Sequence, residues 1–123
     1  MNSHKTWEPA PHPEDLARFF TVRANAGDAE GLAALYEPDA VLVTSGGQVV
    51  RGTDAIREFY AGLLAGRPTF QAGDQRPAVR HDDIALTSSR LVNGAVTAEV
   101  ARRQPDGSWL WIIDQPAIAK ETA

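Results

Sequence analysis

The side chains with the clearest chemical potential lie on the last strands that the sequence predicts. Residues 109–113 are all apolar and Asp114 follows them directly, so this carboxyl is expected to be buried. Glu99 lies on the preceding strand, and Arg90 lies on the strand before that. Two carboxyls in an apolar site cannot both ionise cheaply, so they share a proton or an arginine neutralises one. An acid with a raised pKa beside an ionised one is a general acid/base pair, and the predicted catalytic residues are Arg90, Glu99 and Asp114.

The turns between these strands determine which side chains face each other. A two-residue loop at Asn93-Gly94 places Ser88 opposite Glu99. Pairing of residues 104 and 109 across Pro105-Asp106-Gly107 then places Glu99 opposite Asp114. Directly opposed residues share a sheet face, which is expected to be the cavity face. The other residues predicted on it are Ile84, Leu86, Arg90, Thr97, Leu110 and Ile112.

Two alternatives remain open for this cluster. A loop of three residues at Pro105-Asp106-Gly107 would slip the register by one and move Asp114 to the opposite face. Arg90 and Glu99 would otherwise form an exposed cross-strand ion pair, which contributes little to stability.

Helical periodicity predicts three helices ahead of these strands. The first begins at Pro13 and ends at Gly27. The second is capped by Asp28 and stops at Pro38. The third starts with Thr53 as its N-cap and ends at residues 66–68.

From residue 69 onward the apolar pattern is typical of strands. A strand at 69–80 is interrupted by Gly73 and Pro77 and is expected to be irregular or at an edge. A strand at 84–92 and a long hairpin at 95–116 follow. The predicted fold class is therefore α+β, a cone of three N-terminal helices packed on a curved, mostly antiparallel sheet. Such a cone encloses an apolar cavity unless large side chains fill it.

Composition limits the organisation and the classes of function. The 123 residues suffice for one domain, expected at 12–119 between a flexible N-terminal arm at 1–11 and a tail at 120–123. A net charge of -4 argues against a nucleic-acid surface, and no apolar run reaches the roughly 20 residues of a membrane span. The start lacks an apolar signal core, so a cytoplasmic location is expected. The chain has no cysteine and no histidine spacing typical of a metal site, so no metal or cofactor is expected.

Three stretches of the chain resemble a known family. They are 25–40 (NAGDAEGLAALYEPDA), 52–60 (GTDAIREFY) and 106–109 (DGSW) with the strand that follows. These stretches are similar to SnoaL-like and ketosteroid-isomerase-like members of the nuclear transport factor 2-like superfamily, and the resemblance covers residues 14–119. It implies a cystatin-like fold, which hosts isomerases, dehydratases, cyclases, epoxide hydrolases and binding modules.

The resemblance breaks down at the catalytic positions of the steroid isomerases. Those enzymes use an aspartate base, with a tyrosine and a protonated aspartic acid as oxyanion donors. The base falls at Thr44 and the donor tyrosine at Phe20, and neither side chain can perform that role. The donor acid falls at Glu99, while Tyr36 and Tyr60 match supporting tyrosines. The resemblance thus implies the fold without steroid isomerisation, and it adds Phe20, Tyr36, Thr44 and Tyr60 to the predicted pocket lining, beside Leu86, Ser88, Thr97 and Ile112.

Three functions are compatible with these features. The first is a cofactor-independent enzyme that isomerises, cyclises, dehydrates or hydrates a small, largely apolar metabolite. The second is a binding module without chemistry, as the losses at Thr44 and Phe20 suggest. The third is a structural dimerisation domain whose cavity is filled by aromatic residues.

The apolar run 109–113 also predicts a partner surface. Because both faces of this strand are apolar, one face is expected to supply the core and the other a homodimer interface. With Asp114, Leu110 and Ile112 on the cavity face, Trp109, Trp111 and Ile113 are expected at the interface.

Overall fold

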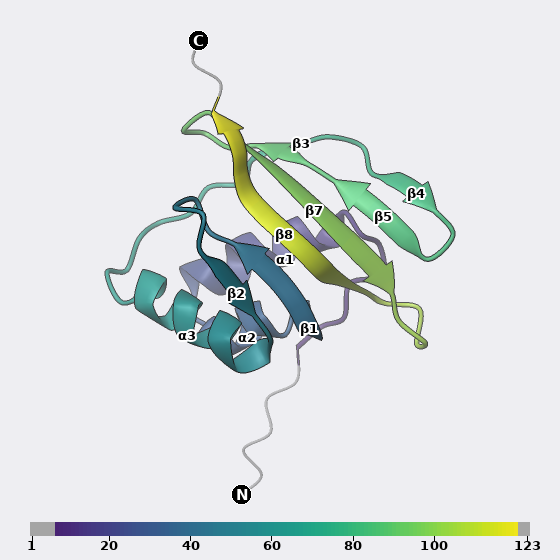
Figure 1. Cartoon of the computed structure of the whole chain (residues 1–123), viewed down its shortest axis with the longest axis horizontal. Coiled ribbons are helices and arrows are strands. Elements are labelled where there is room, and N and C mark those ends of the chain that lie inside the picture. The colour runs from purple at the N-terminus through teal and green to yellow at the C-terminus, as the bar shows by residue number, and fades with distance from the viewer. Residues whose placement is uncertain (1–6, 121–123) are drawn as a thin grey trace, which may run out of the picture.

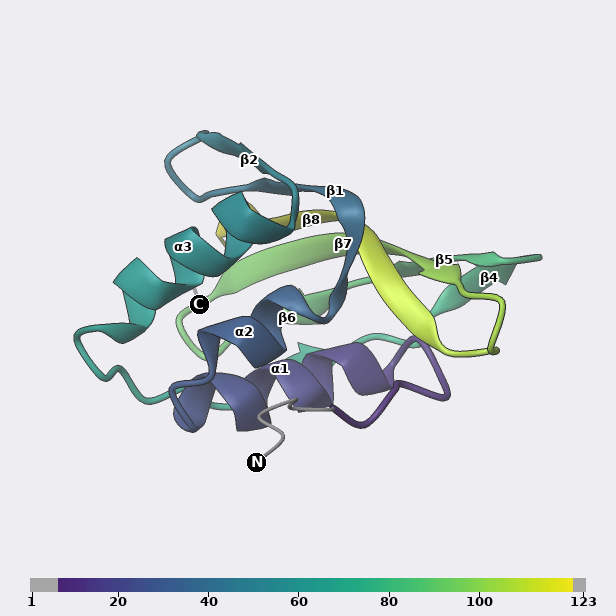
Figure 2. The same cartoon turned by 90° about the horizontal axis from the view of Figure 1, so that it is seen from below.

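Three helices cover one face of a curved mixed sheet in the computed structural model of the protein, which describes residues 7–120 (Figures 1 and 2). The helices are α1 (Asp15–Asn25), α2 (Ala29–Ala33) and α3 (Thr53–Leu64). The strands are β1 (Tyr36–Val43), β2 (Val49–Arg51), β3 (Asp74–Gln75), β4 (Val79–His81), β5 (Ile84–Thr87), β6 (Ser89–Arg90), β7 (Ala95–Arg103) and β8 (Trp109–Lys120). The predicted α+β cone is confirmed.

The sheet is ordered β2-β1-β8-β7-β5-β4, and β6 joins β7 to β3 at one end. All pairings are antiparallel except that of β1 with β8, which is parallel. The core lies between the concave face of this sheet and the helices (Figure 2). The strand expected at 69–80 consists of the two short strands β3 and β4, in agreement with its predicted irregularity.

The first two helices are held together by polar contacts that the sequence predicts only in part. Asp28 caps α2 as expected, because its carboxylate accepts a hydrogen bond from the Gly31 amide at 2.9 Å. Arg23 is buried at the end of α1 and donates to the carbonyl oxygens of Gly31 and Glu8. Burial lowers the pKa of Arg23, and these carbonyls stabilise its charge in place.

The N-terminal segment packs on the domain from Trp7 onward. The Trp7 indole donates to Asp28 at 2.8 Å, and buried Ala10 forms a bridge with Trp109 at the start of β8. The rest of the expected arm, residues 1–6, lies outside the described residues, as does the tail beyond residue 120. None of the described helices is long and apolar enough to cross a membrane.

Two element boundaries differ from the prediction. The second helix ends at Ala33 instead of Pro38, because Tyr36 already pairs with Trp111 of β8 and starts a strand. Thr53 is the first residue of α3 and makes no capping bond, while Gly52 occupies the N-cap with φ of 90°.

The predicted register of the hairpin before β7 is wrong by one residue. Leu91 and Ala95 close the loop through the hydrogen bond from Leu91 N–H to Ala95 C=O, so the loop has three residues and ends at Gly94 with φ of 90°. Asn93-Gly94 therefore forms the end of a bulged turn instead of a two-residue loop. As a result Thr87, and not Ser88, lies opposite Glu99.

The hairpin between β7 and β8 combines a shorter loop with a compensating bulge. Gln104 N–H donates to Ser108 C=O, so Pro105-Asp106-Gly107 is a three-residue loop. Up to Trp111, each residue of β7 therefore pairs with the β8 residue one position earlier than predicted. Ile112 is an extra residue on β8 between the partners of Ala101 and Val100, and this bulge restores the predicted register. Beyond this bulge Glu99 lies opposite Asp114, as predicted.

The bulge changes which face each residue of β8 occupies. Trp109 and Trp111 point into the core with 2% and 4% of their surface exposed, while Ile113 lies on the outer face with 48% exposed. The prediction that Trp109 and Trp111 form a dimer interface is therefore wrong. Leu110 and Ile112 are half-buried and alternate with the two buried tryptophans, so they do not surround the acid pair.

Two exposed glycines allow a test of the turn that ends at Gly107. Gly107 has φ of 88° and a Cβ there would meet no atom within 4 Å, so Gly107→Ala should reduce the free energy of unfolding by about 1–2 kcal/mol through backbone strain alone. Gly62→Ala is the matched control: it is equally uncrowded but lies in α3, and should increase that free energy by about 0.5–1 kcal/mol. Urea denaturation measures both, and equal effects of the two substitutions would contradict the assigned turn.

Candidate active site

Two buried carboxyls face each other at the centre of the inner sheet face. Glu99 on β7 is 7% exposed and Asp114 on β8 is 5% exposed, and they are direct cross-strand partners. Thr87 extends this row onto β5, and its hydroxyl donates to Glu99 Oε1 at 2.7 Å. The three strands therefore present a polar row, Thr87, Glu99 and Asp114, inside an apolar core.

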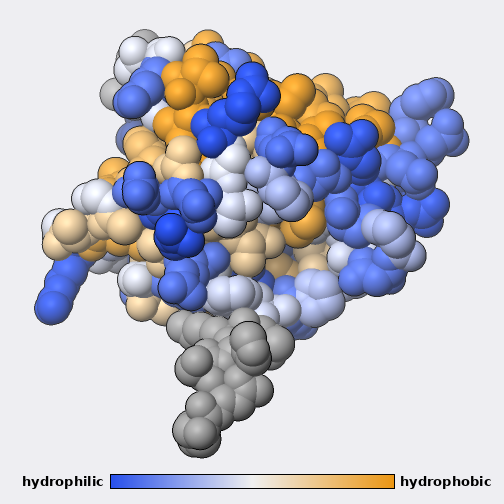
Figure 3. Space-filling model, turned by 60° about the horizontal axis from the view of Figure 1, so that its bottom comes forward, coloured by the Kyte–Doolittle hydropathy of each residue, from blue (hydrophilic) through white to orange (hydrophobic). Residues whose placement is uncertain are grey.

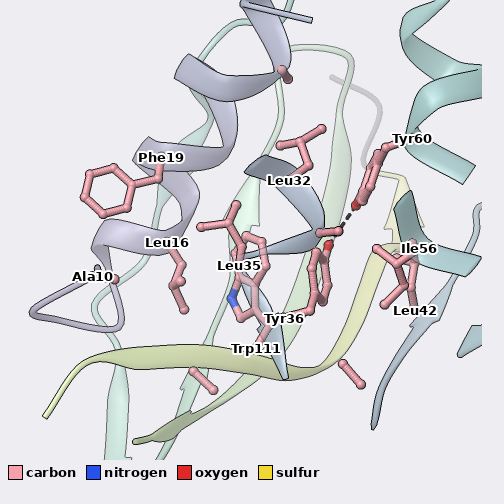
Figure 4. Packing of buried hydrophobic residues seen from close by; sticks show 14 of the residues in the cluster. Ala10, Leu16, Phe19, Leu32, Leu35, Tyr36, Leu42, Ile56, Tyr60 and Trp111 are labelled. Carbon is pink, nitrogen blue, oxygen red and sulfur yellow. Dashed lines mark hydrogen bonds between the residues drawn. The ribbon is translucent and has the colours of Figure 1, made fainter. Parts of the chain in front are cut away.

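Two tyrosines complete the site from the other side. The Tyr36 hydroxyl donates to Asp114 Oδ2 at 2.5 Å. It also lies 2.7 Å from the Tyr60 hydroxyl (Figure 4). When Asp114 is ionised, Tyr36 uses its proton for that bond, so Tyr60 is the donor in the second. Tyr60 is carried by α3 and Tyr36 by the start of β1, so the chain Tyr60–Tyr36–Asp114 connects the helical layer to the sheet.

Burial sets the protonation of the two acids. It raises the pKa of Asp114 to about 7, and the charge of Glu99 contributes to this rise, while the Tyr36 hydrogen bond opposes it. Burial also raises the pKa of Glu99, against the hydroxyls of Thr97 and Thr87, which favour its ionised form. Among the described groups that shift these two pKa values there is no lysine or arginine. Near neutral pH the pair is therefore expected to hold about one proton, with Asp114 as its site.

Four aromatic rings form a closed ring of contacts beside the acids. The centroid distances are 5.6 Å for Phe20 and Tyr60, 6.2 Å for Tyr60 and Tyr36, 5.2 Å for Tyr36 and Trp111, and 6.3 Å for Trp111 and Phe20. We call these four residues the aromatic quartet. Figure 4 shows Trp111 of β8 beside Tyr36, and the hydroxyls of Tyr36 and Tyr60 directed toward each other.

The segment between α3 and β3 covers the quartet on its outer side. Phe70 in this segment is half-buried and packs edge-on against Phe20, with centroids 5.9 Å apart. The Asn25 side chain holds the Phe70 backbone through two hydrogen bonds, of 2.7 and 2.9 Å. Phe20 and Phe70 are therefore the part of the aromatic cluster nearest to solvent.

The structure does not bring Arg90 to the acid pair. Arg90 is exposed on β6, where its partner is Val96 of the outer face. The reason is the three-residue loop ending at Gly94, which moves the β6 residues by one position relative to the predicted pairing. Leu86 is likewise on the outer face, with half of its surface exposed.

The remaining predicted pocket residues divide between the site and its borders. Thr97 is buried next to Glu99 on the inner face, and its hydroxyl accepts from the Ser89 amide. Ser88 is half-buried and donates to the Thr97 carbonyl oxygen. Thr44 lies at the turn after β1, bonded to Gln48, and Ile112 forms the bulge. Phe20, Tyr36 and Tyr60 lie in the site.

Sequence reasoning missed Thr87 and Trp111. Ser88 was predicted in the place that Thr87 occupies, and Trp111 was assigned to the outer face, because loop length and a bulge determine the face of each residue and neither follows from the alternation of residue types. Two surface hollows lie apart from the acid pair. One, of about 610 Å3, is lined by His12, Arg80, Arg103 and Trp109 among others, and one of about 320 Å3 includes Ser89 and Arg90. In the described part of the chain no group of three or more His, Asp or Glu residues is placed to hold a metal ion.

A family model for the SnoaL-like domain matches residues 16–114, which include both acids. The chain belongs to the SnoaL-like domain family. Among solved structures it is similar to a cystatin-like domain of unknown function from Nostoc punctiforme, with 15% identity, 88% and 74% of the two chains covered and a TM-score of 0.72. It is also similar to an NTF2-like protein with a cystatin-like fold from Novosphingobium aromaticivorans, with 23% identity, 89% and 80% covered and a TM-score of 0.62.

A ketosteroid isomerase-like protein from Erwinia carotovora atroseptica is a further structural neighbour of this SnoaL-like chain. It shares 23% identity over 86% of this chain and 93% of the other, with a TM-score of 0.63. At this level of identity the similarities establish the nuclear transport factor 2-like fold, and the chemistry has to be inferred from the site.

The buried acid pair predicts an unusual dependence of stability on pH. Because the pKa of Asp114 is higher in the folded state, about 7 against 3.8, folding takes up a proton between these values. The stabilisation is complete below about pH 4 and is lost as the pH rises to about 7, so the free energy of unfolding should fall by a few kcal/mol over this range.

Urea denaturation of the wild type and of Asp114→Asn between pH 4.5 and 8.5 measures this dependence. The variant should lack most of the decline and be the more stable protein at pH 8, because it removes the ionisable group whose charged form burial disfavours. Asp39→Asn, which changes an exposed carboxyl on β1, should retain the decline. A wild-type stability that rises from pH 4.5 to 8 would contradict the assigned protonation.

Proposed function

We propose that this SnoaL-like protein is a cofactor-independent acid/base enzyme acting on a small, largely apolar molecule, which it isomerises, cyclises, dehydrates or hydrates. The observation that supports this most is the direct pairing of Glu99 and Asp114 on a buried sheet face. No arginine or lysine of the described residues is among the groups that shift their pKa values. Burial raises the pKa of both acids, that of Asp114 to about 7, which suits proton transfer.

The surroundings assign different roles to the two carboxyls. Asp114 has a pKa of about 7 and holds the shared proton, so it serves as the acid. Glu99 accepts hydrogen bonds from hydroxyls that favour its charged form, so it serves as the base. Tyr36 and Tyr60 position Asp114 and stabilise the charge that remains on it after proton donation. The aromatic quartet supplies the apolar surface for the substrate.

Solvent deuterium exchange tests this function before the natural substrate is known. The wild type is incubated in D2O with a panel of small cyclic ketones, enones, β-hydroxy ketones and epoxides, and mass spectrometry detects products and deuterium incorporation. Asp114→Asn and Glu99→Gln should each reduce the rate by about 10²–10⁴-fold, the contribution of a positioned acid or base.

Asp39→Asn is the control for this experiment, since that carboxyl is exposed on β1 and outside the site. It should turn over the same compounds at the wild-type rate. Equal rates in the wild type and in Asp114→Asn would contradict the enzyme and favour the second function, a binding module. The closed packing of the aromatic quartet instead favours the third function, a structural dimerisation domain whose cavity is filled by aromatic residues.

The outer sheet face supports a homodimer, with a corrected set of interface residues. Val79, Leu86, Val100 and Ile113 are successive cross-strand partners on β4, β5, β7 and β8. Three of them expose about half of their surface or more. Figure 3 shows apolar residues gathered along the upper side of the molecule, where the outer sheet face is seen obliquely. An apolar row of this length on a small domain is typical of a surface that a second copy covers.

If the protein is a homodimer, light scattering at micromolar concentration should give a mass of twice 13.3 kDa. Ile113→Lys should give the monomer mass, because it places a charge in the apolar row, at its end on β8. Val22→Lys should leave the dimer intact, since Val22 is equally exposed but lies on α1, away from the outer sheet face. A wild type that is monomeric, or an Ile113→Lys variant that remains dimeric, would exclude this interface.

A further inference from the structure

The acid pair is closed off from solvent by the elements packed around it. Glu99, Asp114, Tyr36 and Tyr60 are all buried, and neither of the two surface hollows described above includes any of them. A molecule that is to reach the carboxyls therefore requires one of the covering elements to move. The question is which of these elements can move while the core stays folded.

The covering segment between α3 and β3 is held by few interactions, and we call its residues 68–72 the strap. Figure 2 shows the chain after α3 running as an open loop past the end of α1. Within the described residues, the hydrogen bonds of the strap are the two that join Phe70 to Asn25. Its other side chains are exposed, and the half-buried Phe70 ring packs against Phe20. The three helices, by contrast, each bury several residues in the core.

A single side chain fastens the strap to the domain. Asn25, the last residue of α1, donates from Nδ2 to the Phe70 carbonyl oxygen at 2.9 Å and accepts from the Phe70 N–H at 2.7 Å. Both bonds are exposed, so water can replace them when the strap leaves. Segments held by few buried apolar contacts and by exposed hydrogen bonds are the ones that open locally.

Both ends of the strap are fixed. Before it, the Arg67 N–H donates to the Leu64 carbonyl oxygen at 2.9 Å, and the backbone turns there with φ of 53°. After it, Gly73 packs so closely on Leu91 that a Cβ would lie 2.9 Å from that side chain. A short loop between two fixed points is an arrangement that lets a lid swing without disturbing its scaffold.

We infer that the strap is the gate of the acid site and that the Asn25 side chain is its latch. When the two bonds of Asn25 break, Phe70 leaves Phe20, and the Phe20 ring is free to turn toward solvent. The centroid of Phe20 lies 5.6 Å from that of Tyr60, so this movement opens a path to the tyrosines and the acids behind them. The inference rests on the proposed function for the place that the gate serves, and it concerns access and not the reaction.

Fluorine NMR measures the movement of the strap without a ligand. In protein labelled with 4-fluorophenylalanine, each of the four phenylalanines gives one signal. The change of its chemical shift between H2O and D2O, the solvent shift, reports contact of the ring with water. Asn25→Ala should raise the solvent shifts of Phe20 and Phe70 to that of an exposed ring, while buried Phe19 keeps its value. Unchanged Phe20 and Phe70 signals in this variant would overturn the inference.

Asp106→Ala is the matched control for Asn25→Ala. The Asp106 carboxylate also makes two exposed hydrogen bonds to a single loop residue, Ser108, but in the hairpin between β7 and β8, away from the strap (Figure 1). Its removal should leave the phenylalanine solvent shifts at their wild-type values. A control that raises them as much as Asn25→Ala would show a general loosening of the domain and overturn the role of Asn25.

The tyrosines report whether the opening reaches the site. The chain has two tyrosines, so 3-fluorotyrosine gives two signals, and both come from the site. In the wild type both rings should be free of contact with water, and in Asn25→Ala the Tyr60 signal should gain a solvent shift. A Tyr60 ring without such contact, combined with exposed Phe20 and Phe70 rings, would mean that the strap covers the surface alone and would overturn the gate.

Hydrogen exchange of the wild type gives a result that needs no variant, and it decides if Asn25→Ala does not fold. The Phe70 amide, which is bonded to the Asn25 side chain, should exchange at least roughly tenfold faster than the Trp111 amide, which is bonded to the backbone of Leu35 in the core. Equal rates for the two amides would mean that the strap opens only when the whole domain unfolds, and would overturn the gate.

The gate and the proposed function can fail separately, because none of these measurements uses a substrate. An opened strap in Asn25→Ala, combined with no deuterium incorporation into any test compound, would remove the enzyme and leave a gated binding site. Deuterium incorporation by a protein whose strap stays closed in Asn25→Ala would retain the enzyme and overturn the gate.

Discussion

One extra residue on β8 determines the character of the whole interior. Without the bulge at Ile112, the alternation that buries Trp109 and Trp111 would also bury Ile113 and direct Asp114 outward. With it, a single strand contributes two tryptophans to the core, one isoleucine to the outer face and one carboxyl to the site. The acid pair and the apolar outer row both depend on this change of face.

Among the described residues, the side chains that donate hydrogen bonds to the two acids are neutral hydroxyls. Thr87 donates a hydrogen bond to Glu99, and Tyr36 donates one to Asp114. Hydrogen bonds from hydroxyl groups offset only part of the free energy needed to transfer a carboxylate from water into the protein interior. The domain therefore tolerates an arrangement that disfavours its own folding as the pH approaches 7. Such an arrangement is typical of residues retained for chemistry at the expense of stability.

Much of the fold follows from the sequence, and the failures have a common cause. Asp28 as a cap, the irregular segment around Gly73 and the Glu99–Asp114 pairing could be predicted, because side-chain chemistry and turn residues specify them locally. The faces of Arg90, Leu86 and Trp111 could not, since each depends on whether a loop has two or three residues or on whether a strand carries a bulge. The two errors of register at the β8 hairpin cancelled, so the acid pair was correct while its surroundings were not.

The place of β8 in the sheet has a consequence for how the protein is made. β8 comprises residues 109–120, yet it lies in the interior of the sheet, between β1 and β7. During synthesis the helices and β1 emerge well before β8, which pairs with β1. The edge of β1 and the apolar faces of the helices therefore remain uncovered until β8 has been synthesised. Non-local pairing of this kind slows folding and leaves apolar surface exposed on the nascent chain. Ribosome-bound chains that stop before residue 109 should therefore be the species most in need of a chaperone.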